Sequence, residues 1–138
     1  KAKINPMAQT LLVADTNVLL DLFVFRDPRV AVLHQQIDDR SLQMIYCQAM
    51  HEEFVDVIAR SQFELSKTEQ QSILNIWKTY AELYVLEQSA PVRCNDPDDQ
   101  VFIDLAYQAK PCVLISKDLA LVRLKNKLQK FSIDLQTY

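Results

Sequence analysis

Three short apolar segments constrain the fold of this 138-residue chain more than any other feature of its sequence. They span residues 11–14, 42–46 and 112–115, and stretches with helical spacing lie between them. Apolar segments this short are typical of strands buried on both faces, and strands that alternate with helices form parallel sheets. The sequence therefore predicts an α/β fold of three layers, α/β/α, in which helices cover both faces of a mostly parallel central sheet.

Capping residues mark where several of the helices should begin. Asp27 and Asp96 are each followed by proline, which suits an N-cap and the first helical position. Ser66 and Glu69 have the spacing of a capping box. The predicted helices and strands, by residue range, are a helix at 48–60, one from 66 with an apolar stripe reaching 84, one from 96 to 109, a basic helix at about 119–130, a short strand at 85–86 and a last strand within 131–137.

Composition excludes several classes of protein. The chain contains no glycine, so it cannot carry the glycine-rich loops of P-loop or dinucleotide-binding proteins. Its three cysteines are widely spaced, and we expect buried, unpaired thiols in a reducing compartment. No apolar run is long enough to span a membrane, and none resembles a signal peptide, which predicts a cytoplasmic protein. The net charge of −3 argues against coating nucleic acid by charge alone.

Acidic residues lie where a parallel sheet binds its ligands. Asp15 and Asp118 each follow a predicted strand, and ligands of open α/β sheets bind beyond the carboxyl ends of the strands. Further acids occupy the helix start at 96–99, and Glu53 borders the apolar stripe of its own helix. Each of these residues taken alone also suits a helix N-cap or a solvated surface.

Carboxylates that converge on one site repel one another unless a counter-charge is present. A hard divalent cation supplies that charge and prefers oxygen ligands, which favours Mg²⁺ or Mn²⁺ over Zn²⁺. Such an ion activates water and stabilises charge that develops on a phosphate. The acidic pattern therefore favours hydrolysis of a phosphodiester.

Four stretches of the sequence resemble, in order, the four motifs of PIN domains. The opening motif is VADTNVLL at 13–20 and the second is HEEFVDVI at 51–58. DPDDQVFIDLA at 96–106 and LISKD at 114–118 resemble the third and fourth motifs of the VapC-like branch, the toxins of toxin–antitoxin pairs. The resemblance runs from about Leu11 to the end of the sequence. We expect one PIN-like nuclease domain over residues 7–138, with residues 1–6 a cloning remnant or a disordered N-terminus.

The resemblance implies a metal-dependent endoribonuclease that uses Mg²⁺ or Mn²⁺ and cleaves RNA. It also implies an antitoxin protein as partner and a homodimer. The implied catalytic and metal-binding acids are Asp15, Glu53, Asp99 and Asp118. The implied supporting residues are Asn17, Ser116 and Asp96. The basic residues that we expect at an RNA-binding edge, or else on a solvated helix face, are Lys117, Arg123, Lys125 and Lys127.

Two positions depart from the family pattern. Lys117 replaces the usual glycine, and Ala120 stands where many relatives have a second aspartate. Lys117 would either hold a scissile phosphate or pair with an acid and weaken metal binding.

Two other functions remain open at this point. One is a PIN scaffold that binds RNA or a protein without cutting. The other is a haloacid-dehalogenase-like phosphatase with Asp15 as nucleophile. The phosphatase motif has a second acid two residues later, where this chain has Asn17.

Overall fold

A five-stranded, entirely parallel sheet organises residues 9–138, the part of the chain that the computed structural model describes. The strands are β1 (Thr10–Ala14), β2 (Leu42–Tyr46), β3 (Ala81–Leu83), β4 (Cys112–Ile115) and β5 (Ile133–Gln136). Their order is β3-β2-β1-β4-β5, so the chain reverses its direction across the sheet between β1 and β4. The predicted α/β class and parallel sheet are confirmed, whereas the expectation for residues 1–6 lies outside the described residues.

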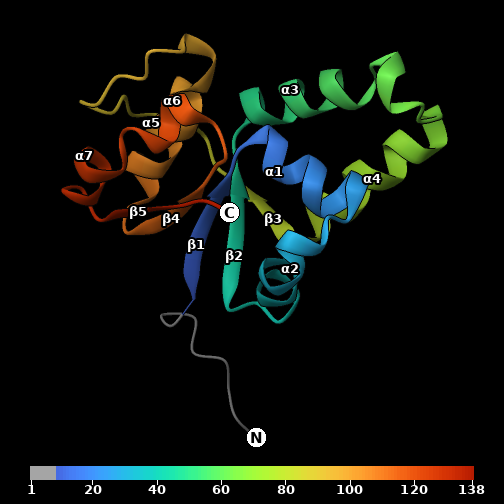
Figure 1. Cartoon of the computed structure of the whole chain (residues 1–138), viewed down its shortest axis with the longest axis horizontal. Helices are drawn as coiled ribbons and strands as arrows, with labels where there is room; N and C mark the ends of the chain where they lie inside the picture. The colour runs from blue at the N-terminus through green and yellow to red at the C-terminus, as the bar shows by residue number, and fades with distance from the viewer. Residues whose placement is uncertain (1–8) are drawn as a thin grey trace, which may run out of the picture.

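Helices flank this sheet on both sides (Figure 1). They are α1 (Thr16–Leu20), α2 (Ala31–Asp38), α3 (Gln48–Ile58), α4 (Lys67–Tyr80), α5 (Gln100–Ala109), α6 (Leu119–Val122) and α7 (Lys125–Gln129). In Figure 1, α1 to α4 lie to the right of β1, and α5 to α7 gather around β4 and β5 on the left. A π-helical segment, Asp21–Phe25, continues α1, and 3-10 turns cover Pro28–Val30, Ser61–Phe63 and Pro97–Asp99. None of the described helices is long and apolar enough to cross a membrane.

The core contains the apolar faces that the sequence pattern predicts. In α3, the residues of the apolar stripe that Glu53 borders are all buried: Met50, Phe54, Val57 and Ile58. Trp77 of α4 packs edge-on against Phe54 of α3, with 5.2 Å between ring centroids, and both side chains are fully buried. The capping box of α4 is present, because Glu69 N–H donates to the Ser66 hydroxyl at 3.0 Å and Ser66 N–H donates to Glu69 at 2.8 Å. All three cysteines are free thiols, and two of them are buried.

Three of the predicted elements are wrong in detail. The helix expected from residue 66, with an apolar stripe that reaches 84, ends at Tyr80. The strand expected at 85–86 is instead β3, which begins directly at the end of α4 and pairs Met44 with Ala81. It is an edge strand with exposed Glu82 and Leu83, so it has no apolar run that would mark it in the sequence. The single basic helix expected at 119–130 is two short helices, α6 and α7, separated at residues 123–124.

The absence of glycine has a structural consequence. Among residues 9–138, four adopt the left-handed backbone conformation that glycine favours: Arg26, Arg40, Glu64 and Ser132, with φ between 51° and 68°. Arg26 and Glu64 end helical segments, where a left-handed residue is the common way to terminate a helix. The chain therefore forms its tight turns with residues for which this conformation costs more than it would for glycine.

A segment of irregular backbone, residues 84–96, connects β3 to the turn before α5 and is called the strap below. Side chains on one face of α5 hydrogen-bond to it. Gln108 accepts from the backbone N–H of Glu87 at 2.7 Å. Asp104 accepts from Ala90 N–H at 2.9 Å, and Gln100 accepts from Cys94 N–H at 2.7 Å. Because these three α5 side chains are four residues apart, they lie on one helical face. The strap runs from there directly into the acidic residues that precede α5.

Candidate functional site

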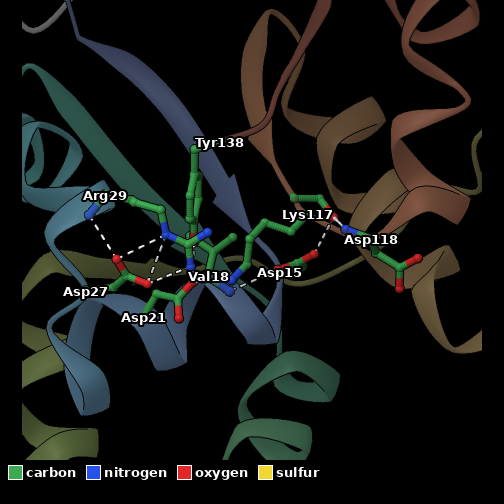
Figure 2. Close-up of polar contacts among 9 residues, drawn as sticks. Asp15, Val18, Asp21, Asp27, Arg29, Lys117, Asp118 and Tyr138 are labelled. Carbon is green, nitrogen blue, oxygen red and sulfur yellow. Dashed lines mark hydrogen bonds and ion pairs between the residues drawn. The ribbon is translucent and has the colours of Figure 1, made fainter.

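Asp15 lies at the carboxyl end of β1, at the crevice where the sheet order reverses (Figure 2). Its side chain is buried, with 3% exposure. One carboxylate oxygen accepts from Val18 N–H at 3.0 Å and so caps α1, and the other accepts from the Ser116 hydroxyl. The N-cap interpretation of Asp15 is therefore correct, but capping uses only one of its two oxygens.

Asp118 occupies the matching position after the neighbouring strand, β4. It caps α6 by accepting from Ala120 N–H at 2.9 Å, and its own N–H donates to the Ser116 hydroxyl oxygen at 2.9 Å. Ser116 is fully buried and donates to Asp15, so it connects the two strand-end aspartates through one oxygen atom. Strands β1 and β4 are neighbours in register, with Ala14 opposite Ile115, which brings both aspartates to one edge of the sheet.

Glu53 reaches the same edge from α3. Its Oε2 accepts a hydrogen bond from the hydroxyl of buried Thr16 at 2.7 Å. Thr16 is a residue that the sequence analysis missed, although it stands between the motif residues Asp15 and Asn17. Asn17 itself is exposed, and no hydrogen bond joins it to Asp15 within residues 9–138. Ser116 and the backbone of α1 orient Asp15 in its place.

The third group of acids comes from the 3-10 turn that precedes α5. Asp96 caps this turn by accepting from Asp98 N–H at 3.0 Å. Carboxylate oxygens of Asp96, Asp99 and Asp118 all lie within 4.8 Å of one another. Oδ2 of Asp99 is buried and has no hydrogen-bond partner in the described part of the chain. Three converging carboxylates with an unpartnered buried oxygen are ligands that suit a hard cation, so this cluster could hold a metal ion.

A pocket of about 250 Å³ brings the four principal acids together. Asp15, Glu53, Asp99 and Asp118 all line it, and so does Asn17. The lining also includes Arg60, Gln62 and Phe63, from the residues that follow α3. Arg60 pairs with Asp56 at 3.3 Å, and both side chains are more than half exposed, so this pair constrains it weakly.

The electrostatics of the pocket favour a bound cation. Burial, with a smaller contribution from the charge of Asp118, raises the pKa of Asp15 to about 6, although hydrogen bonds from Ser116 and Val18 oppose the rise. Burial raises the pKa of Asp99 to about 7, together with the close approach of the Asp118 carboxyl and the negative charges of Asp96 and Asp15. Carboxyl groups whose ionisation is this unfavourable gain most from a nearby positive charge.

Lys117 supplies only a small part of that charge, because it is the weakest of the influences that lower the pKa of Asp15. Its Nζ lies 2.6 Å from Oδ2 of Asp21, and Figure 2 shows the side chain running toward Asp21 and away from Asp118. Arg123 between α6 and α7, and Lys125 and Lys127 on α7, are exposed, and none of them lines the acidic pocket. Of the basic residues, Arg60 is the one whose position in the pocket wall was not expected.

The raised pKa of Asp15 makes the stability of the metal-free protein depend on pH. Well below pH 4 the carboxyl is protonated in both the folded and the unfolded state. As the pH rises, the unfolded chain ionises first, so the folded state loses stability until the pH passes the folded pKa of about 6. We expect Asp15→Asn, which keeps the cap, to become more stable than wild type across this window, by up to about 3 kcal/mol.

Urea unfolding in EDTA between pH 4 and 8 measures this difference. Asp134→Asn removes an exposed carboxylate on β5 and serves as the matched control, with no comparable trend. A difference between Asp15→Asn and wild type that does not change with pH would contradict the electrostatic account of the pocket.

Comparisons with known proteins agree with the fold and the motifs. The solved structures include a similar chain in the crystal structure of VapBC2 from Rickettsia felis bound to a DNA fragment from their promoter. The similarity has a TM-score of 0.60 at 13% sequence identity and covers 93% of this chain and 98% of that one, which establishes a shared fold. No curated protein sequence matches significantly. The model of the PIN domain family matches residues 11–120, so this chain belongs to the PIN domain family.

Proposed function

We propose that this PIN domain is a metal-dependent endoribonuclease whose catalytic and metal-binding residues are Asp15, Glu53, Asp99 and Asp118. The observation that carries the proposal is their convergence: four carboxylates from four separate segments line one pocket of about 250 Å³. Structural carboxylates of a stable fold seldom gather without a counter-charge, because their repulsion costs stability. A function that uses the cluster accounts for this arrangement, and a purely structural role does not.

The pocket residues fit a divalent cation of the Mg²⁺ or Mn²⁺ type. The donors are carboxylate oxygens, and Oδ2 of Asp99 is buried without a hydrogen-bond partner among residues 9–138. Asp96 lies close enough to Asp99 and Asp118 to assist them. When bound, such an ion lowers the pKa of a coordinated water and neutralises charge on the phosphate that is attacked.

The surrounding residues hold these carboxylates in place. Ser116 donates to one oxygen of Asp15 and accepts from the backbone N–H of Asp118. These two hydrogen bonds fix the positions of the two aspartates relative to each other. Thr16 holds one oxygen of Glu53 and leaves the other available for a water molecule or the ion. Preorganisation of this kind reduces the rearrangement that catalysis requires.

RNA is the substrate that we propose, and exposed cations near the pocket would bind its phosphates. Arg60 lines the pocket, and Arg123, Lys125 and Lys127 follow Asp118 along the chain. We leave Lys117 out of this group because its ion pair with buried Asp21 would have to break first. An RNA phosphate next to several carboxylates needs such contacts, since repulsion would otherwise keep it away.

The biological role that we propose is the toxin component of a toxin–antitoxin pair, acting as a homodimer with an antitoxin protein as partner. The likeness in fold to a chain of VapBC2 supports this role. The phosphatase alternative loses its basis, because the family match covers the motif that contains Asp15. A PIN scaffold that binds RNA without cutting remains the second candidate, and the first experiment below separates the two.

Removal of one pocket acid should abolish cleavage. We expect Asp99→Asn to reduce cleavage of a fluorescent single-stranded RNA by roughly 100-fold or more, because a ligand should matter at least as much as an outer-shell partner. Wild-type activity should require Mn²⁺ or Mg²⁺ and disappear in EDTA. The control is Asp134→Asn, which removes an exposed acid from β5 and should cut like wild type. Saturable RNA binding without metal-dependent cleavage by the wild type would instead favour the scaffold.

Substitutions of the basic residues should separate phosphate binding from catalysis. In an Asp99→Asn background, which prevents cutting, we expect Arg123, Lys125 and Lys127 changed together to alanine to flatten the salt dependence of RNA affinity by about 2 units of slope. Arg60→Ala should flatten it by about 0.7. Fluorescence anisotropy at several salt concentrations measures both slopes. Lys110→Ala, which changes an exposed lysine at the opposite end of β4, is the matched control. An unchanged slope in the triple variant would mean that these residues form only a solvated helix face.

A further inference from the structure

We propose that Asp21 is a positioning residue: it holds the Lys117 ammonium away from the acidic pocket and thereby leaves the pocket free for a metal ion. The inference rests on the proposed function of that pocket. It explains how this chain tolerates a lysine directly beside Asp118, where the family usually has glycine.

The contacts of Asp21 are unusually specific for a residue outside the pocket. Asp21 begins the π-helical segment that continues α1, and its side chain is 7% exposed. Its Oδ2 lies 2.6 Å from Nζ of Lys117 and accepts a hydrogen bond from the Tyr138 hydroxyl, also at 2.6 Å (Figure 2). The Tyr138 ring lies 5.2 Å from the same ammonium group. One buried carboxylate is thus held by a charge and a hydroxyl that come from distant parts of the chain.

A free Lys117 side chain would have few other places to go. Its backbone lies between Ser116, which hydrogen-bonds Asp15, and Asp118. Even when it is paired with Asp21, Lys117 lowers the pKa of Asp15, so its charge already reaches the pocket.

Asp27, a carboxylate outside the pocket whose pKa Lys117 also lowers, is already paired with Arg29 at 2.7 Å. Because the lysine stem is long and flexible, loss of Asp21 would let the ammonium move to the pocket acids and replace the cation that they otherwise bind.

The alternative is that the Lys117–Asp21 ion pair is purely structural and only links the turn after β4 to the segment after α1. The two roles predict different results for Lys117. If the ion pair is purely structural, then loss of either partner should change the Mn²⁺ affinity of the pocket to the same extent. If Asp21 restrains a competing cation, then loss of Asp21 weakens metal binding, whereas loss of Lys117 does not, and removal of both restores the affinity.

The experiment measures Mn²⁺ affinity of the full chain without RNA, by calorimetry, in four proteins whose folding is checked by thermal melting. We expect Asp21→Asn to weaken Mn²⁺ binding by roughly tenfold, as one added positive charge near the ion would do at a protein surface. Lys117→Met should bind Mn²⁺ at least as tightly as wild type. The double variant Asp21→Asn/Lys117→Met should recover to within about threefold of Lys117→Met.

Asp27→Asn is the matched control, because it removes a neighbouring carboxylate whose partner is Arg29 and not Lys117. It should bind Mn²⁺ like wild type. Wild-type affinity in Asp21→Asn, or a double variant as weak as Asp21→Asn, would overturn the inference while the proposed nuclease function stands. A wild-type protein with no saturable Mn²⁺ binding would overturn both.

Should Asp21→Asn fail to fold, Tyr138→Phe provides the same test. It removes the hydrogen bond to Asp21 and keeps both charges, so Lys117 should leave Asp21 more often. We expect Tyr138→Phe to weaken Mn²⁺ affinity about two- to threefold, roughly the effect of one lost hydrogen bond. Adding Lys117→Met to this variant should restore the affinity. An unchanged affinity in Tyr138→Phe would then count against the inference.

Discussion

Negative charge that is partly buried at the carboxyl ends of β1 and β4 is the constraint around which the rest of this site is arranged. Neighbouring parallel strands place Asp15 and Asp118 at the same edge of the sheet, and the turn before α5 adds Asp99. Burial raises the pKa of Asp15 and Asp99, so this edge is under electrostatic strain unless a cation is present. The fold tolerates that strain because buried hydrogen bonds and strand pairing fix the backbone that carries each acid.

The same hydrogen bonds serve both the fold and the proposed chemistry. Asp15 and Asp118 each cap a helix with one oxygen, which fixes the orientation of the carboxylate. Ser116 ties the two together, and Asp21 binds the one lysine next to them. An aspartate that caps a helix can therefore also bind a metal ion. The helix-cap interpretation and the metal-site interpretation of these two residues are compatible.

Local patterns allowed much of the fold to be predicted, because apolar runs and caps act over a few residues. The strands at 11–14, 42–46 and 112–115 and the capping box of Ser66 are of this kind. Edge strand β3 escaped prediction because it is half exposed and begins without a loop after α4. The partners Thr16–Glu53 and Lys117–Asp21 join residues 37 and 96 positions apart by contacts that no single-sequence pattern encodes. Motif order located the acids, whereas the residues that restrain them became visible only in three dimensions.

The most direct test of this account is the anomalous scattering of a crystal soaked in Mn²⁺. If the acidic pocket is a metal site, a single strong peak, or two adjacent ones, will lie among the carboxylates of Asp15, Asp99 and Asp118. A well-ordered pocket without anomalous density at saturating Mn²⁺, or a peak bound only at another acidic surface, would contradict the central claim.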